Sequence, residues 1–407
     1  MQDNEKKPAL RFKGFTDPWE QRKVGELLTE RNEQAPMSDE YPLMAFIANE
    51  GVAPKGERYD RSALVNDTAS KLYKKTKFGD FIYSSNNLET GSIGLNKYGK
   101  ASISPVYSIF KPTGIADSDF LGRRLIRKDF INEMVKWRQG VIYGQWRIHE
   151  SDFIKIEVTV PTVEEQYKLG LLLDNLDTLI TLHQRKYEKL LNIKKSMLDK
   201  MFPQNGVSVP EIRFKGFTDP WEQRKLGEIA KEVVRNDPAS DAPIMMITAG
   251  NGFIEQSDRY AFNNAGESLK KYILLECGEL AYNHGASKLR PYGSCFALTT
   301  VEKARIPFVY HCFSVEKSNP EFLSIELNGA NVENQLRKIV SSGARMDGLL
   351  NIAYSEYTEV TVQLPKKEEQ DWIAKFFKQL DTLITLHQRK LEKLQNIKKS
   401  CLEKMFV

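Results

Sequence analysis

The chain has 407 residues, of which 41% are hydrophobic and 28% charged, a composition typical of an ordinary globular protein with two or three domains. No apolar run approaches the ~18 residues that cross a bilayer, and the N-terminal residues lack a signal-peptide stretch, so we expect no membrane span and a cytoplasmic location. The net charge of +5 does not by itself indicate nucleic acid.

The first recognisable element is a short repeat at residues 11–26, reading RFKGFTDPWEQRKVGE. It recurs at 213–228 with a single change, Val24 to Leu226. Its Gly and Asp-Pro-Trp steps predict a turn that leads into a short helix or strand. Trp19 and its counterpart Trp221 are expected to pack inside the fold, with stacking on a base as the alternative. We expect residues 1–26 to complete the second half of the molecule.

Residues 27–160 and 229–364 follow the two repeats and differ from each other in sequence, but their lengths of 134 and 136 residues nearly match. Short β-type runs with frequent Gly, Pro and Asn predict a mixed α/β domain in each. The segments 78–84 and 277–283 share a pattern of turn, strand and polar loop, which indicates two versions of one domain. The domains hold 19 Lys+Arg against 17 Asp+Glu and 13 against 16, so any DNA contact must come from local clusters.

Polar loops are the candidate binding elements of these two domains. Amides and hydroxyls can read base edges, Lys and Arg can hold phosphate or guanine, and glycine allows close approach of the backbone. A solvated surface loop is the alternative for each segment. The candidate DNA-binding residues are Lys74, Lys75, Lys77, Ser84, Ser85, Asn86, Asn87, Lys97, Tyr98, Tyr143, Gln145, Arg147, Asn283, His284, Ser287, Lys288, Arg290, Tyr292, Ser341, Ser342 and Arg345.

A long helix is predicted after each variable domain. Residues 176–202 recur at 380–406 with 23 of 27 positions identical, and neither copy contains Gly or Pro. Apolar positions at steps of three and four predict a seam for one partner helix. The seam residues are Leu173, Leu176, Ile180, His183, Tyr187, Leu190, Met197, Phe377, Leu380, Ile384, His387, Leu391, Leu394 and Cys401.

The two seams are natural partners, although each helix could instead pack on its own domain. We therefore expect an α+β fold in which two mixed α/β domains are separated by an antiparallel two-helix coiled coil, with a pseudo-twofold repeat of about 204 residues. The predicted parts are the repeat unit 1–26, domain 27–160, central region 161–228 with the first spacer helix, domain 229–364 and spacer helix 365–407. A helix of about 30 residues spans ~45 Å, or ~13 base pairs of B-DNA, so it would space two readers by about one helical turn.

These repeats resemble the specificity subunits of type I restriction-modification enzymes, which serve in host defence. The resemblance rests on the LDxLIxLHQRKxEKLxNIKKSxLxKMF helices, the RFKGFTDPWEQRKxGE units and the PxxEEQ helix starts. It implies that the variable domains are target recognition domains for an asymmetric bipartite DNA sequence. It further implies that the helices dock two methyltransferase subunits, which use S-adenosylmethionine to methylate a flipped adenine. Separate restriction subunits would use ATP and Mg²⁺, and this chain would hold no cofactor.

No methyltransferase, Walker A or nuclease motif is present, so we expect no catalysis by this chain. His183 and His387 lie at equivalent seam positions, where polar residues usually set the register. Cys277, Cys295, Cys312 and Cys401 have no metal-like spacing and are expected to be reduced thiols. Two alternatives remain: an enzyme with its active site in the variable domains, and a bivalent coiled-coil scaffold for a ligand other than DNA.

Overall fold

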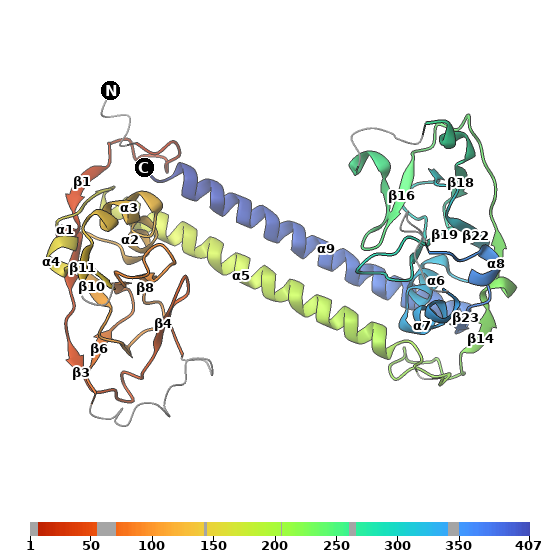
Figure 1. Cartoon of the computed structure of the whole chain (residues 1–407), viewed down its shortest axis with the longest axis horizontal. Helices are drawn as coiled ribbons and strands as arrows, with labels where there is room; N and C mark the ends of the chain where they lie inside the picture. The colour runs from red at the N-terminus through yellow and green to blue at the C-terminus, as the bar shows by residue number, and fades with distance from the viewer. Residues whose placement is uncertain (1–6, 55–70, 142–144, 205, 260–265, 341–349) are drawn as a thin grey trace. The chain divides into compact units, whose positions relative to one another are not determined.

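The computed structural model describes residues 7–54, 71–141, 145–204, 206–259, 266–340 and 350–407 (Figure 1). Contacts divide the chain into two compact units. Unit 1 comprises residues 1–184 and 389–407, and unit 2 comprises residues 185–388. Each unit therefore contains one α/β body, one stretch of the first long helix and one stretch of the second.

The described residues of the unit 1 body form short strands and short helices, followed by the first long helix. Its strands are β1 (Glu20–Lys23), β2 (Leu28–Glu30), β3 (Gln34–Ala35), β4 (Ala45–Ile47), β5 (Gly51–Ala53), β6 (Tyr73–Thr76), β7 (Phe81–Tyr83), β8 (Ile93–Leu95), β9 (Ala101–Ile103), β10 (Ser108–Pro112), β11 (Gln139–Val141), β12 (Gln145–Arg147) and β13 (Glu157–Val160). Its helices are α1 (Val24–Leu27), α2 (Ser118–Arg124), α3 (Lys128–Lys136), α4 (Glu150–Phe153) and the start of α5 (Val163–Lys200).

The body of unit 2 has a corresponding set of elements. Its strands are β14 (Glu222–Lys225), β15 (Ala230–Glu232), β16 (Met245–Thr248), β17 (Gly252–Glu255), β18 (Ile273–Glu276), β19 (Leu280–Asn283), β20 (Ser294–Ala297), β21 (Lys303–Ile306), β22 (His311–Val315) and β23 (Thr361–Leu364). Its helical elements are η5 (Leu226–Glu228), η6 (Gln256–Asp258), η7 (Gly266–Lys271), α6 (Pro320–Leu327), α7 (Ala330–Ile339), α8 (Tyr354–Tyr357) and the start of α9 (Lys367–Lys404).

The two bodies share one framework despite their different sequences. In unit 1 the four-stranded sheet has the order β2-β10-β7-β8, and in unit 2 the order β15-β22-β19-β20. The strand of each short repeat pairs antiparallel with the last strand of its body, β1 with β13 and β14 with β23. The predicted mixed α/β class is confirmed, and the two bodies are versions of one domain.

The turn before the central strand explains the sequence similarity between 78–84 and 277–283. Gly79 and Gly278 have positive φ angles of 83° and 90°, where a side chain would be strained. The next residue is acidic in both units and accepts a backbone N–H three residues earlier, Lys77 N to Asp80 Oδ2 at 2.7 Å and Glu276 N to Glu279 Oε2 at 2.7 Å. A glycine and a carboxylate are therefore needed at this turn in either body.

A buried Arg–Glu pair ties the short repeat to the first turn of the long helix in each unit. Arg11 donates Nε and Nη2 to Glu165 at 2.9 and 2.6 Å, and Arg213 donates the same atoms to Glu369 at 2.8 and 2.6 Å. Both glutamates are 1% exposed. The described part of residues 1–26 lies within unit 1, where it also meets the end of the second repeat's helix: Leu10 N donates to Lys404 O at 2.9 Å.

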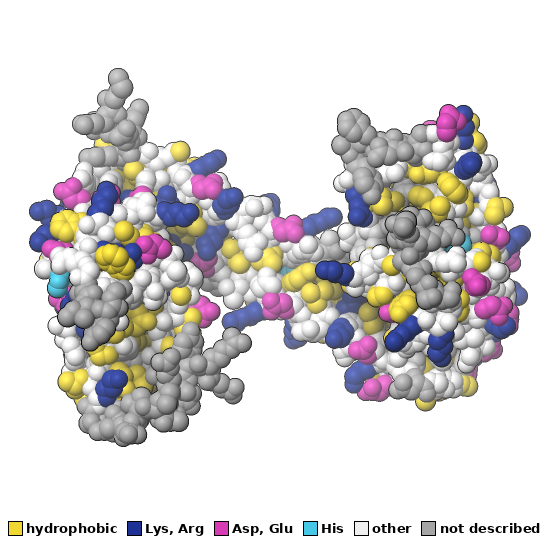
Figure 2. All heavy atoms as spheres, in the orientation of Figure 1, with side chains coloured by type: hydrophobic (Ala, Val, Ile, Leu, Met, Phe, Trp, Pro, Cys, Tyr) yellow, Lys and Arg dark blue, Asp and Glu magenta, His cyan; other side chains and the backbone are white. Residues whose placement is uncertain are grey.

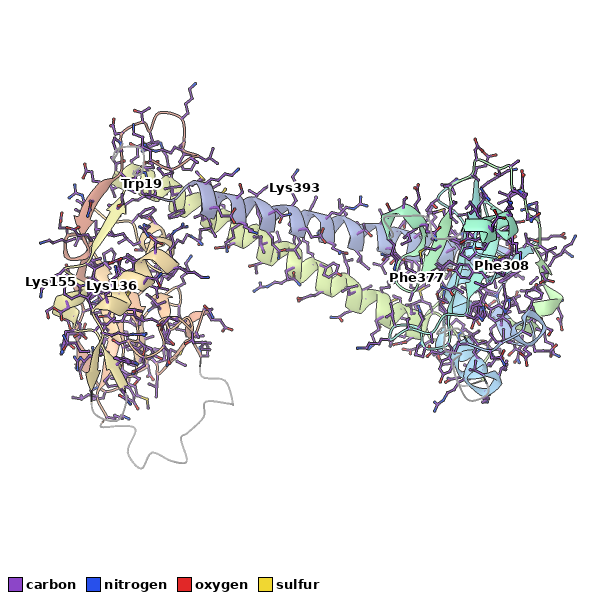
Figure 3. The ribbon with its side chains drawn as sticks, turned by 45° about the horizontal axis from the view of Figure 1, so that its top comes forward. Trp19, Lys136, Lys155, Phe308, Phe377 and Lys393 are labelled. Atoms are coloured by element: carbon purple, nitrogen blue, oxygen red, sulfur yellow. The ribbon has the colours of Figure 1, made fainter. Side chains whose placement is uncertain are left out.

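In the core of each unit, aromatic side chains of the body pack on a phenylalanine that follows the long helix of the other repeat. In unit 1, Trp19 (Figure 3) and Phe120 pack on Phe406 from the last residues after α9, at ring-centroid distances of 6.2 and 5.5 Å. In unit 2 the corresponding rings are Trp221, Phe322 and Phe202 from the end of α5. Both tryptophans are buried, so they pack inside the fold, as expected from the sequence.

The long helices pair along the predicted seam in each unit. Leu173 and Leu176 of α5 belong to the same core cluster as Cys401 near the end of α9, and Leu394 packs against that cluster. The ion pairs Asp177–Lys398 in unit 1 and Lys194–Asp381 in unit 2 fix an antiparallel register. The other seam positions, Ile180, His183, Tyr187, Leu190, Met197, Phe377 (Figure 3), Leu380, Ile384, His387 and Leu391, are buried or half-buried.

Candidate nucleic-acid interface

The two polar loops predicted in unit 1 lie side by side. Ser85 Oγ accepts the backbone N–H of Ile148 at 2.9 Å, and Asn86 Oδ1 accepts that of Trp146 at 2.6 Å. The Tyr83 hydroxyl donates to Ile148 O at 3.3 Å from within the core. The loop after β7 is therefore joined to the β11–β12 ribbon, and the fold brings together side chains that are 60 residues apart in sequence.

Unit 2 joins its corresponding segments through His284. The backbone N–H of Leu350 donates to His284 O at 2.9 Å. The His284 ring nitrogens lie 2.8 Å from two carbonyl oxygens, Nδ1 from Leu350 O and Nε2 from Val309 O. His311 stacks on this ring at 5.1 Å, and burial together with the neighbouring His284 lowers the pKa of His311.

The candidate residues divide by exposure into two groups. The exposed ones are Lys77, Asn86, Asn87, Lys97, Tyr98, Gln145, Arg147, Ser287 and Lys288. The half-buried ones are Ser85, Asn283, Arg290 and Tyr292, and the buried ones are Lys74, Lys75, Ser84 and His284. Tyr143, Ser341, Ser342 and Arg345 lie outside the described residues. The DNA contacts of all the candidate residues remain predictions. Only the exposed group has side chains that are fully accessible to a ligand.

Several of the predicted cations are already engaged within the chain. Lys75 Nζ donates to Pro36 O at 2.6 Å and to Ser102 Oγ at 3.0 Å. Arg290 donates Nη1 to Asn328 O at 2.7 Å, and burial lowers the pKa of its guanidinium. Lys97 forms ion pairs with Asp119 and Asp174. Arg147 forms a longer contact, 3.4 Å, with Glu150 while its side chain stays 55% exposed.

Sequence reasoning missed one accessible side chain on the ribbon of unit 1. Trp146 lies between the candidates Gln145 and Arg147 and is 49% exposed. Its backbone is held by Asn86, so the indole projects from an anchored position. The signal in the sequence was a large aromatic residue flanked by an amide and a guanidinium, a combination that can stack on a base as well as form hydrogen bonds.

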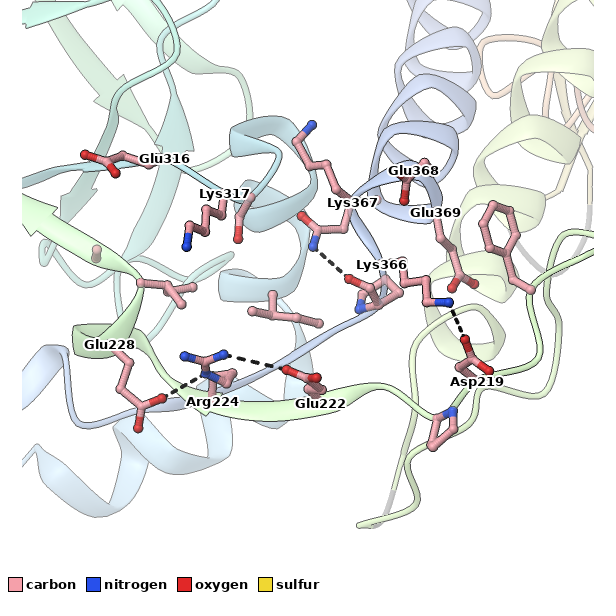
Figure 4. Close-up of a pocket in the computed structure, with 18 of the residues that line it drawn as sticks. Asp219, Glu222, Arg224, Glu228, Glu316, Lys317, Lys366, Lys367, Glu368 and Glu369 are labelled. Carbon is pink, nitrogen blue, oxygen red and sulfur yellow. Dashed lines mark hydrogen bonds and ion pairs between the residues drawn. The ribbon is translucent and has the colours of Figure 1, made fainter.

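A cavity of unit 2 lies beside the short repeat, with a volume of about 1060 Å³ (Figure 4). Its acidic and basic side chains are largely paired with each other. Asp219 binds Lys366 at 2.6 Å, and Arg224 Nε binds Glu228 at 2.9 Å. These contacts give the charged side chains of the cavity a structural role at the junction of the short repeat and α9.

The described part of the chain contains no group of three or more His, Cys, Asp or Glu side chains arranged for a metal ion. Its helices also include none with the length and apolar character of a membrane span. Cys295, Cys312 and Cys401 are buried free thiols and Cys277 is exposed. Burial raises the pKa of the Cys295 thiol to about 12.

Comparison with known proteins gives a consistent result. Residues 218–396 match the family model of the type I restriction modification DNA specificity domain. The chain is 24% identical over 425 aligned residues to a type I restriction enzyme specificity subunit of Methanocaldococcus jannaschii, with 94% of this chain and 91% of that protein covered.

One solved structure shares the fold. The S subunit of a type I restriction-modification system from M. genitalium aligns with a TM-score of 0.56 at 13% identity and covers 98% of this chain and 99% of its own. The HsdS subunit from Thermoanaerobacter tengcongensis aligns with a TM-score of 0.40 at 16% identity, covering 95% of this chain and 96% of its own.

Proposed function

We propose that this chain, which belongs to the specificity subunits of type I restriction-modification systems, reads an asymmetric two-part DNA target with one recognition surface in each unit. As a specificity subunit it recognises DNA and takes no catalytic role. The observation that carries the proposal is one framework that bears a different polar loop after the equivalent strand of each unit, β7 in unit 1 and β19 in unit 2. A common framework positions both loops in the same way, whereas their different side chains would read different bases.

In unit 1 the proposed readers are the exposed Asn86, Gln145 and Arg147, with Trp146 as a stacking platform. An amide can bind adenine and a guanidinium can bind guanine through two hydrogen bonds each. In unit 2 the exposed Ser287 and Lys288 belong to the loop that follows β19. His284 would act by holding this loop against residues 350–352, and we assign it a positioning role.

The partners follow from the outer faces of α5 and α9. Arg185, Lys186 and Lys189 of α5 are exposed and recur as Arg389, Lys390 and Lys393 of α9, the last labelled in Figure 3. Exposed residues are under no packing constraint, so their identity in both repeats favours one kind of partner binding twice. We assign this partner to two methyltransferase subunits that supply S-adenosylmethionine, with restriction subunits supplying ATP and Mg²⁺ chemistry.

The spacing between the two half-sites would be set by the paired helices. Each helix has 38 residues and rises about 57 Å at 1.5 Å per residue. The apolar seam and the ion pairs Asp177–Lys398 and Lys194–Asp381 set one register of the two helices. One register would give the spacer one length.

Mapping of N6-methyladenine in a genome, with and without this chain, tests the proposal. We expect methylation at one two-part sequence that disappears without the chain. Exchanging residues 27–160 for those of another specificity subunit should change one half of that sequence and leave the other intact. Methylation that does not depend on the chain would refute the proposal, and a change in both halves would refute the assignment of one reader to each unit.

A side-chain test separates DNA binding from the alternative of a scaffold for another ligand. Arg147→Gln should weaken binding of the target duplex by about 1–3 kcal/mol. Lys155→Gln is the matched control, because Lys155 (Figure 3) is also exposed and also pairs with a carboxylate three residues away. Equal effects of the two changes, or no salt-dependent duplex binding in the presence of the methyltransferase, would favour the scaffold.

A further inference from the structure

A second apolar stripe runs along the outside of each long helix, separate from the seam. In α9 it comprises Trp372, Phe376, Leu383 and Leu386, at steps of three and four with Gln379 between them. Trp372, Leu383 and Leu386 are 57%, 45% and 44% exposed, although they lie on a helix that already has a partner. Figure 2 shows apolar side chains among Lys and Arg on the exposed surface of the paired helices.

The same positions of α5 carry a stripe 204 residues earlier. Leu179 and Leu182 are 42% and 44% exposed and correspond to Leu383 and Leu386. Single exposed leucines are common on protein surfaces, but a periodic row on one face marks an interaction site. Two copies of the row at the same helical positions indicate two sites for one kind of partner.

In each unit the other helix adds an isoleucine to the stripe. The ion pairs that set the antiparallel register place Ile397 within one residue of the level of Leu179 in unit 1, and Ile193 within one residue of the level of Leu383 in unit 2. Leu179 and Leu383 immediately precede seam residues, and the two isoleucines immediately precede the lysines of the ion pairs, which continue the three-and-four spacing of the seam. Such positions of two antiparallel helices flank the same side of the seam. Ile397 is 40% exposed. Each stripe is therefore a two-helix surface.

The stripes differ at their outer ends. In unit 2, Trp372 packs edge-on against Phe214 and Phe217 at 5.6 and 6.2 Å. In unit 1 the position of Trp372 is occupied by Lys168, whose ammonium lies 4.7 Å from the ring centroid of Phe15 and 2.8 Å from Glu164. The outer end of the stripe is thus an indole packed on two phenyl rings in unit 2, and an ammonium group next to a phenyl ring in unit 1.

The next position adds to the same difference. Phe376 stands in unit 2 where unit 1 has Leu172, and both are half-buried. A partner that covers the stripe buries a large aromatic surface at Trp372, whereas at Lys168 it must desolvate an ammonium group. The same partner therefore gains more at unit 2 than at unit 1.

The occupant that fits both stripes is an amphipathic helix with acidic flanks. Its apolar residues would lie along the leucines as in a helix bundle. Its acidic residues would face Lys186 and Lys189 in one helix and Lys390 and Lys393 in the other, which border the stripes and are exposed. A shallow groove of about 490 Å³ along α5 in unit 2 includes Ile193 and Lys189 in its lining.

We propose that the two docking stripes are unequal, and that a methyltransferase subunit fills the unit 2 stripe before a second copy fills the unit 1 stripe. This inference rests on the proposed function, from which it takes the identity of the partner. The complex with one partner would then be a defined intermediate in which unit 2 is occupied.

Titration of the full chain with its cognate methyltransferase subunit, followed by native mass spectrometry, tests this order. We expect two dissociation constants that differ about tenfold. Trp372→Lys should bring both constants to the weaker value, and Lys168→Trp should bring both to the tighter value. At one equivalent of partner, hydrogen exchange should slow in residues 371–379 before residues 167–175, which differ in sequence and give distinct peptides.

Val163→Lys is the matched control. Val163 is 47% exposed and its counterpart in α9 is Lys367, but it lies about 140° around the helix from Lys168 and about 180° from Leu172, so the two constants should not change. Two equal dissociation constants overturn the inference, and so do unequal dissociation constants that neither Trp372→Lys nor Lys168→Trp changes. In both cases the proposed partner stands. No binding of the methyltransferase by the unaltered chain overturns both. Lys168→Trp keeps the test valid whatever the stability of the Trp372 variant, since it predicts a gain of affinity.

Discussion

Removal of Arg213 should lower the free energy of unfolding of unit 2 by more than most single substitutions do. In Arg213→Met the guanidinium that binds Glu369 through two hydrogen bonds is lost, and Glu369, which is 1% exposed, keeps a buried charge without a partner. Breaking a buried pair in this way costs about 3–5 kcal/mol. For a unit of 204 residues this corresponds to a decrease in Tm of ~6–20 °C, at 2–4 °C per kcal/mol.

Differential scanning calorimetry and urea unfolding measure this loss directly. Arg224→Met is the control, because the Arg224–Glu228 pair has side chains that are 45% and 49% exposed and should contribute at most about 1 kcal/mol. The double change Arg213→Met with Glu369→Leu should recover much of the stability, since no charge is then left unpaired. Equal losses for Arg213→Met and Arg224→Met, or no recovery in the double variant, would refute the reasoning.

Three further predictions concern other parts of the chain. Burial raises the pKa of Glu326 to about 7. The folded state therefore retains a proton that the unfolded state releases near pH 4.5, and the free energy of unfolding should fall by about 3 kcal/mol as the pH rises between these values. Glu326→Gln should remove this pH dependence, which urea unfolding at pH 4.5 and 8 measures. If the substitution changed the free energy of unfolding equally at both pH values, the prediction would be wrong. Trp146→Ala should weaken duplex binding by about 1–3 kcal/mol in a fluorescence titration if the indole stacks on a base, while Trp372→Ala should not. Deletion of one heptad from both α5 and α9 should shorten the unread spacer by about three base pairs in a methylation map, and an unchanged spacer would exclude the helices as the ruler.

The long helices and the duplicated framework could be predicted from the sequence because their signals are local. The period of the apolar residues identifies the seam, and the near-identical repeats identify the equivalent parts. The glutamate that pairs with the arginine of each repeat could not be predicted in this way. Arg11 and Arg213 have identical surroundings in sequence, so either could pair with Glu165 or Glu369, and only the tertiary contacts distinguish the two arrangements.

Side-chain accessibility was the other property beyond the reach of the sequence. The run around Lys74 and Lys75 looked like a basic surface, but these residues belong to β6, the middle strand of the β3-β6-β9 sheet. The backbone turns the Lys75 ammonium toward Pro36 and Ser102. Such a placement depends on strands that are paired across the sheet, which a run of charges does not reveal.

The packing of Phe406 against Trp19 and Phe120 also determines the order in which the chain can fold during its synthesis. Unit 2 is continuous, and all of it has been made when residue 388 leaves the ribosome. Unit 1 is made first, yet its core lacks Cys401, Met405 and Phe406 until the whole of unit 2 has been translated. Domains usually fold in the order of their synthesis. Here the core of the first body stays incomplete, with the hydrophobic side chains that contact Phe406 exposed, until the end of the second long helix has been made.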